Sequence, residues 1–165
     1  MDEDTQSTML VQTPLHLQEV IQTWQTTCTA MPEATQVLLK RCPGTSVPEF
    51  RAYYQDHHAK LVLPWCKANG VTYYAQIHGP LKWTTCNPDP NIKLDDWDAA
   101  AEMVFPPGFQ LEEMAEREYY EKVVLPDEKK FLLDEARRHM VVVAAGSVEG
   151  SRVEVIKDGE SVLGE

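Results

Sequence analysis

The segment from residue 46 to residue 70 constrains the fold most, because it predicts a helix with both ends marked. Ser46-Val47-Pro48-Glu49 has the form of a capping box, in which Ser46 caps the helix and Glu49 reaches back to the cap amide. Asn69-Gly70 is a common helix stop. Pro64 lies inside this helix and is expected to kink or shorten it.

The periodic segments that flank this helix predict the order strand-helix-strand-strand-helix-strand. The predicted strands are 36–41, 71–78, 97–105, 139–145 and a short last one at 152–156; the later helices are 110–124 and 126–138; and 79–96 is expected to be irregular and mobile. This order is typical of an α+β, ferredoxin-like antiparallel sheet with helices on one face. The bare face needs a cover, and a homodimer joined face to face is the simplest one.

The chain has 165 residues, which fits one domain with additions at its ends. We expect a polar leader with an N-terminal helix containing Trp24 over residues 1–34, the α+β domain over 35–157 and a tail over 158–165. The acidic, polar start resembles neither a signal peptide nor a transit peptide, so a cytoplasmic location is expected.

The formal net charge of −11 argues against nucleic acid or an anionic membrane as a partner, because either would be repelled. No stretch is long and apolar enough to cross a bilayer. The four cysteines (Cys28, Cys42, Cys66 and Cys86) lack the spacing of a zinc site, and we expect free thiols.

Two adjacent histidines lie on the predicted helix 47–69. An apolar stripe runs along one side of this helix at about 100° per residue, and it contains Tyr54 and Trp65. His57 and His58 lie on the two edges of the stripe, so periodicity does not choose between them. Histidine, with a reference pKa of about 6.5, exchanges protons at neutral pH without heavy tuning.

The strand 71–78 has one polar face, formed by Tyr74, Gln76 and His78. We expect its apolar face to pack under the helices and this polar row to line a cleft on the other side of the sheet, where it suits an oxygenated ligand. On the strand 97–105, Asp98 and Glu102 share a face, and a carboxylate there could orient a histidine.

The motifs of several enzyme classes are missing from the sequence. It has no Gly-rich phosphate loop, no dinucleotide fingerprint, no Gly-x-Ser-x-Gly elbow and no His-Glu-x-x-His pair. We therefore predict no cofactor and no metal, which leaves acid–base chemistry without a cofactor, or ligand binding.

Four segments, taken in order, resemble the EthD-domain family. They are the helix segment 50–64 with its His57-His58-Ala59-Lys60-Leu61 run, the strand 70–78, the strand 96–105 and the late segment 120–131. The resemblance covers roughly residues 35–157. It implies a dimeric α+β barrel, and it is closest to small fungal enzymes of aromatic polyketide clusters, described as decarboxylases or dehydratases of carboxylated, partly aromatised polyketides. The leader 1–34 departs from the family pattern.

The resemblance assigns the family's histidine before Ala-x-Leu to His58 and its strand-end histidine to His78. We therefore predict a cofactor-free carbon–carbon or carbon–oxygen lyase in which these two histidines form the acid/base pair and Asp98 orients one of them. The predicted substrate contacts are Tyr54, Trp65, Tyr74, Gln76 and Glu102. Decarboxylation is favoured over dehydration on the resemblance alone. The alternatives are a polyketide cyclase, a cofactor-free anthrone-type monooxygenase and a non-catalytic binder of aromatic ligands.

Overall fold

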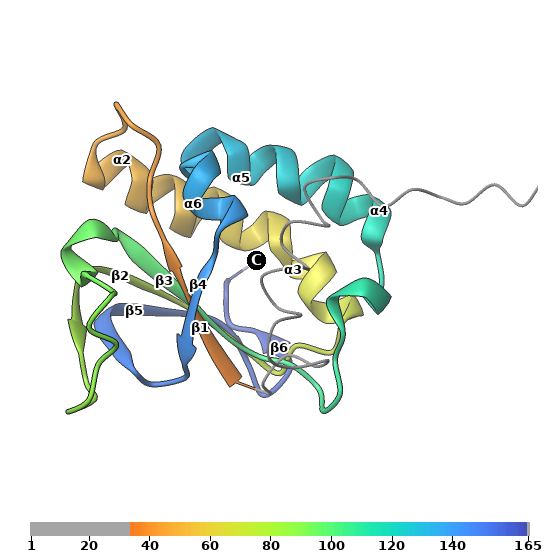
Figure 1. Cartoon of the computed structure of the whole chain (residues 1–165). Helices are drawn as coiled ribbons and strands as arrows, with labels where there is room; N and C mark the ends of the chain where they lie inside the picture. Colours follow the sequence, from red (N-terminus) through yellow and green to blue (C-terminus); the bar gives the residue numbers. More distant parts are fainter. Residues whose placement is uncertain (1–33, 165) are drawn as a thin grey trace, which may run out of the picture.

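The computed structural model describes residues 34–164 and contains one six-stranded antiparallel sheet. The strand order is β4-β1-β3-β2-β5-β6. The strands are β1 (Ala34–Leu39), β2 (Tyr73–Trp83), β3 (Ala99–Val104), β4 (Val141–Ala144), β5 (Val148–Lys157) and β6 (Glu160–Ser161). The α-helices lie over one face of the sheet (Figure 1). The predicted α+β, ferredoxin-like fold is confirmed, whereas the homodimer stays a prediction.

Two long helical segments cover the sheet, and each contains a π-helical turn. The first consists of α2 (Val47–Ala52), η1 (Tyr53–His58) and α3 (Ala59–Ala68), and the second of α4 (Arg117–Tyr119), η4 (Tyr120–Val124) and α5 (Leu125–Phe131). Short elements complete the set: η2 (Leu94–Asp96), η3 (Leu111–Glu113) and α6 (Asp134–Arg138). Of these helices, none has the length and apolar character needed to span a bilayer.

The capping box is present as predicted, with the Ser46 side chain accepting from the Glu49 amide and the Glu49 carboxylate accepting from the Ser46 amide. The helix is not shortened at Pro64 but runs on to Ala68. Pro64 is exposed, so water can solvate the carbonyl group that a proline leaves without its helical partner.

The strand β2 is longer than predicted and continues to Trp83, through the first part of the segment expected to be irregular. Its outer half pairs with β5, with Lys82 opposite Glu149 and Trp83 opposite Val148. This pairing brings Gly150 close to β2, where a Cβ atom would lie 2.5 Å from the carbonyl oxygen of His78. A residue with a side chain would therefore push the two strands apart.

The later helices also differ from the prediction. One segment runs through Pro126 without a break, and the helix ends instead at Leu132, whose extended backbone forms an isolated bridge with Arg41. The predicted tail contains a hairpin turn at Asp158-Gly159, both with positive φ, which returns the chain to pair as β6 with β5. The predicted leader 1–34 lies outside the described residues except for Ala34, the first residue of β1.

The orientation predicted for the two faces of β2 is wrong. The polar row faces the helices, as shown by the 2.7 Å hydrogen bond from Gln76 Nε2 to the Tyr54 carbonyl oxygen. The opposite face instead carries Ile77, which packs with Leu38 and Ala100. Ile92, Leu94 and Trp97 from the loop before β3 complete this cluster. Apolar cover supplied by the chain itself therefore lets the polar row turn toward the helices.

Candidate active site

A cavity of about 130 Å³ lies between the sheet and the helices that cover it. Its lining is mainly apolar. Polar side chains line it at seven positions: Thr35, Tyr54, His58, Tyr74, Tyr120, Glu128 and Arg137. An apolar cavity of about 150 Å³ holds a benzene molecule. The cavity therefore has the size of one aromatic ring, with a few convergent polar groups, as is typical of a small-molecule site.

The imidazole of His58 is held at the cavity wall by Asp127. His58 Nδ1 lies 2.9 Å from Asp127 Oδ2, and both side chains are buried. The π-helical turn η1 forms two columns of rings, with Tyr53 against His57 and Tyr54 against His58 at centroid distances of 4.8 Å and 5.7 Å. The second column faces the cavity, where Phe131 also packs against His58 at 4.9 Å.

Burial lowers the pKa of His58, and the hydrogen bond and charge of Asp127 only partly oppose this effect. The imidazole is therefore neutral at pH 7. Because the Asp127 carboxylate is an acceptor, we assign the proton of the neutral ring to Nδ1. Nε2 then keeps its lone pair and is the nitrogen able to accept a proton from a bound molecule.

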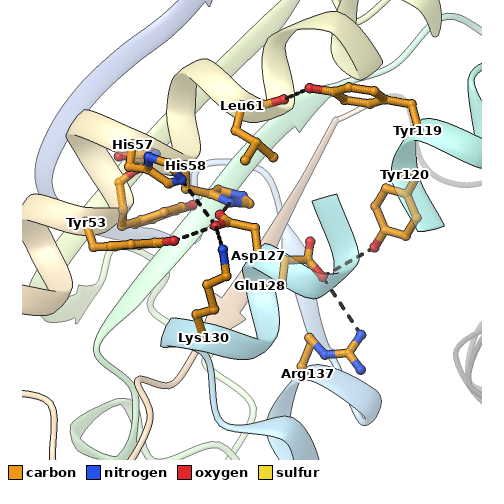
Figure 2. Close-up of polar contacts among 12 residues, drawn as sticks. Tyr53, His57, His58, Leu61, Tyr119, Tyr120, Asp127, Glu128, Lys130 and Arg137 are labelled. Atoms are coloured by element: carbon orange, nitrogen blue, oxygen red, sulfur yellow. Dashed lines mark hydrogen bonds and ion pairs between the residues drawn. The ribbon is translucent and has the colours of Figure 1, made fainter. Parts of the chain in front are cut away.

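Asp127 collects several donors around one carboxylate, as Figure 2 shows. Tyr53 Oη lies 2.5 Å and Lys130 Nζ 3.4 Å from Oδ1, and His57 Nε2 lies 3.3 Å from the same oxygen. Burial raises the pKa of Asp127, but the hydrogen bonds from Tyr53 and His58 outweigh it and the net pKa is lowered. Asp127 therefore stays ionised and stabilises positive charge on His58.

The next residue, Glu128, points to a different set of partners (Figure 2). Its Oε2 lies 3.5 Å from Tyr120 Oη and 3.8 Å from Arg137 Nη1. Burial raises the pKa of Glu128 to about 7, although Arg137 and Tyr120 oppose the effect. The cavity lining thus contains a carboxyl group that is partly protonated at neutral pH and can donate a proton.

The predicted site residues of the helix and of β2 divide into two groups. Tyr54, His58, Trp65 and Tyr74 line the cavity. His78 and Gln76 are buried but lie outside its lining, and the Tyr54 ring packs against His78 at 5.5 Å. Both His78 ring nitrogens lack a hydrogen-bond partner among residues 34–164, and burial together with the charge of Arg51 lowers the His78 pKa to about 4.

The two predicted carboxylates, Asp98 just before β3 and Glu102 on β3, lie away from the cavity. Asp98 accepts from Arg41, with 2.9 Å between Arg41 Nε and Oδ1, so the expectation that it orients a histidine is corrected. Glu102 lies on the sheet face away from the helices, where it binds Arg152 at 2.7 Å and Gln36. The prediction failed because side chains that share a strand face can still face away from the histidines.

Sequence reasoning missed Asp127, Glu128 and Arg137. The first two follow Pro126 and looked like the acidic first turn of a new helix, a pattern with a purely local explanation. In the structure the helix already begins at Arg117, so both acids lie inside a helical segment. If the helix start had been known, two acidic residues in the interior of a partly buried helix would have indicated a functional site.

The described residues contain no group of three or more His, Cys, Asp or Glu side chains placed to hold a metal ion. Cys42, Cys66 and Cys86 are free thiols, and Cys28 lies outside the described residues.

Comparison with known proteins gives one match. The EthD domain model matches residues 42–135, which is more than half of the 165-residue chain. No curated protein and no solved structure matches. The matched region includes His58, Asp127 and Glu128, three of the polar groups in and beside the cavity. The chain therefore belongs to the EthD-domain family.

Proposed function

We propose that the cavity is the active site of a cofactor-free lyase in which His58 and Glu128 transfer protons. The single observation that carries this proposal is the buried 2.9 Å bond between His58 Nδ1 and Asp127, in a cavity that also contains Glu128. The bond leaves His58 Nε2 as a base, while Glu128 supplies an acid with a pKa of about 7. His78 is not needed as the acid, because Glu128 is already present in the lining.

Dehydration of a β-hydroxy ketone uses this pair directly. His58 Nε2 takes the proton from the carbon next to the carbonyl, and the electron pair of that C–H bond forms the new C=C bond. The C–O bond to the hydroxyl breaks, and Glu128 donates its proton so that water leaves. Asp127 stabilises the imidazolium that forms on His58. Each proton transfer contributes on the order of 10²–10⁴-fold.

Decarboxylation of an ortho-hydroxy aromatic acid is the second candidate, and the presence of Arg137 in the lining favours it. Glu128 donates its proton to the ring carbon that carries the carboxylate, and His58 takes the phenol proton. The C–C bond to the carboxylate then breaks and CO₂ leaves. The electron pair of that bond restores the aromatic ring, and His58 returns its proton to the phenolate. Arg137 would hold the carboxylate before it leaves.

An aromatic polyketide intermediate is the proposed substrate. One aromatic ring of it fits the cavity and matches an apolar lining that includes Trp65, Met103 and Phe105, and the family resemblance implies the same class. The homodimer implied by that resemblance is also proposed; light scattering at micromolar concentration with a single 18.7 kDa species would contradict it.

The test is to incubate the protein with partly aromatised polyketides, some with a β-hydroxy ketone and some with an ortho-hydroxy acid. Mass spectrometry then distinguishes loss of water from loss of CO₂. Turnover should fall by about 10²–10⁴-fold in His58→Gln. Oxygen consumption during turnover would indicate the monooxygenase alternative. Ligand binding without turnover in the wild type would favour the binding protein.

A further inference from the structure

Arg137 brings a guanidinium with unused hydrogen-bonding capacity to the cavity. Its side chain is 6% exposed and lies in the lining. Nη2 lies 3.0 Å from Asp134 Oδ1, but Nη1 is 3.8 Å from Glu128, which is beyond hydrogen-bond distance. Its buried Nε has no hydrogen-bond partner within residues 34–164. A buried cation with an unpaired donor is a feature that a bound acceptor would satisfy.

The groups around Glu128 leave the positive charge of Arg137 poorly balanced inside the cavity. The ionisable groups that face Glu128 are Arg137 from α6, Tyr120 from η4, Tyr54 from η1, Tyr74 from β2 and its neighbour Asp127. Burial raises the pKa of all three tyrosines, so they are neutral. Asp127 is occupied by its own donors, and Asp134 is 45% exposed and therefore shared with water.

We propose that Arg137 anchors a carboxylate carried by an aromatic ligand, and that Glu128 takes up a proton when this ligand binds. This inference rests on the proposed function in placing the ligand in this cavity, and it deepens the carboxylate contact of the decarboxylation candidate. A ligand carboxylate that pairs with Arg137 must lie near Glu128, and two carboxylates side by side repel unless one is protonated. Arg137 has the planar donor geometry that a carboxylate matches.

The first experiment uses benzoate and its neutral counterpart benzamide, because each has one ring and fits the cavity size. Calorimetry of benzoate binding to the wild type at pH 8, in two buffers with different ionisation enthalpies, counts the protons taken up. With a Glu128 pKa of about 7, we expect uptake of about 0.9 proton at pH 8. Binding without proton uptake, or no benzoate binding at millimolar concentration, would overturn the proposal.

Variants separate the two roles. In Glu128→Gln, proton uptake should disappear and benzoate affinity at pH 8 should rise about tenfold, since protonation no longer opposes binding. In Arg137→Gln, benzoate affinity should fall at least about tenfold while benzamide affinity is unchanged. The matched control is Arg138→Gln, because Arg138 also pairs with Asp134, at 2.8 Å, but lies outside the lining. Equal benzoate losses in both arginine variants would contradict the anchor.

The outcome is independent of turnover. Benzoate affinity and proton uptake are measured on the wild type and on the Arg137 and Glu128 variants without any substrate. If they behave as expected and no substrate is ever turned over, the proposed lyase activity fails while the anchor stands. If benzoate binds without regard to Arg137 but a substrate is turned over, the anchor fails and the lyase stands.

Discussion

The two faces of the sheet each hold a carboxylate with cationic partners, Glu102 buried on one face and Glu128 largely buried, at 17% exposure, on the other. Comparing them distinguishes a structural carboxylate from one suited to proton transfer. On the face away from the helices, Glu102 is bound by both Nη atoms of Arg152, by Gln36 and by the amide of Gly146. On the helix side, the polar contacts of Glu128 within residues 34–164 are those at 3.5 Å and 3.8 Å. The first carboxylate is saturated and the second is not.

The pKa values follow this difference. Burial raises the pKa of Glu102, but its hydrogen bonds reverse the effect and the net pKa is lowered. The pKa of Glu128 instead rises to about 7. A carboxylate that is fully bound holds strands together and exchanges no proton near neutral pH. Burial of charge therefore does not identify a site by itself; an unsaturated polar group beside a cavity does.

The largest expected effect is on kcat, which should depend on Asp127 and not on Glu102. Asp127→Asn should lower kcat by about 10²–10⁴-fold, because an amide does not hold His58 in the tautomer with a free Nε2 and does not stabilise the imidazolium. Glu102→Gln should leave kcat within a few fold, since Glu102 lies on the other face of the sheet. Steady-state turnover with circular dichroism as a folding check measures both. An inactive, folded Glu102→Gln would break the comparison.

The second effect concerns the pH dependence of stability. The Glu128 pKa rises from 4.5 to about 7 on folding, so its proton stabilises the fold below pH 4.5, and that stability is lost as the pH rises through 7. Between pH 5 and pH 8, Glu128→Gln should therefore gain roughly 2.5 kcal/mol relative to wild type. Urea unfolding at the two pH values measures it.

The matched control for this effect has the opposite sign. The Glu102 pKa is lowered on folding, so its contribution is present above the unfolded pKa and is lost only as the solution becomes acidic. Glu102→Gln should show no comparable gain between pH 5 and pH 8. Parallel pH profiles for the two variants would mean that the two carboxylates do not differ as the structure indicates.

The third effect is smaller and concerns the Glu102 network itself. Arg152→Met should lower the free energy of unfolding by about 1–3 kcal/mol at pH 7, because the buried end of the network loses a charged donor. Arg152 is itself partly exposed, and water replaces some of what is lost. Lys157→Met, which removes an exposed partner of Glu154, is the control and should cost much less.

Local features of the sequence were predictable because they depend on near neighbours. The capping box at Ser46 and Glu49 needs only four residues, and the alternation in β2 correctly groups Tyr74, Gln76 and His78 on one face. A period of two does not tell which face lies under the helices, however, and that orientation was wrong. It depends on what covers Ile77, which comes from the distant segment 92–97.

The site depends on contacts that no local pattern contains. His58 and Asp127 are 69 residues apart, so the carboxylate was sought on β3, where Asp98 and Glu102 share a face with each other but not with the histidine. The π-helical turn at 53–58 is also invisible to a wheel drawn at about 100° per residue. The family resemblance pointed to His58, and the structure supplied its partner.

The smallest expected effect is that of His57, and it sharpens the comparison between the solvent side and the cavity side of Asp127. The His57 side chain is 53% exposed and lies 3.3 Å from Asp127 Oδ1, an oxygen that Tyr53 and Lys130 also reach. His57→Gln should therefore change kcat by less than about threefold and stability by less than about 1 kcal/mol. The same assay on His58→Gln gives the contrast, because that residue lines the cavity and its Nδ1 is bound to Oδ2. Both variants must be shown to fold before their rates are compared. An inactive His57→Gln beside an active His58→Gln would assign the chemistry to the solvent-side histidine, and the mechanism proposed for the cavity would then be wrong.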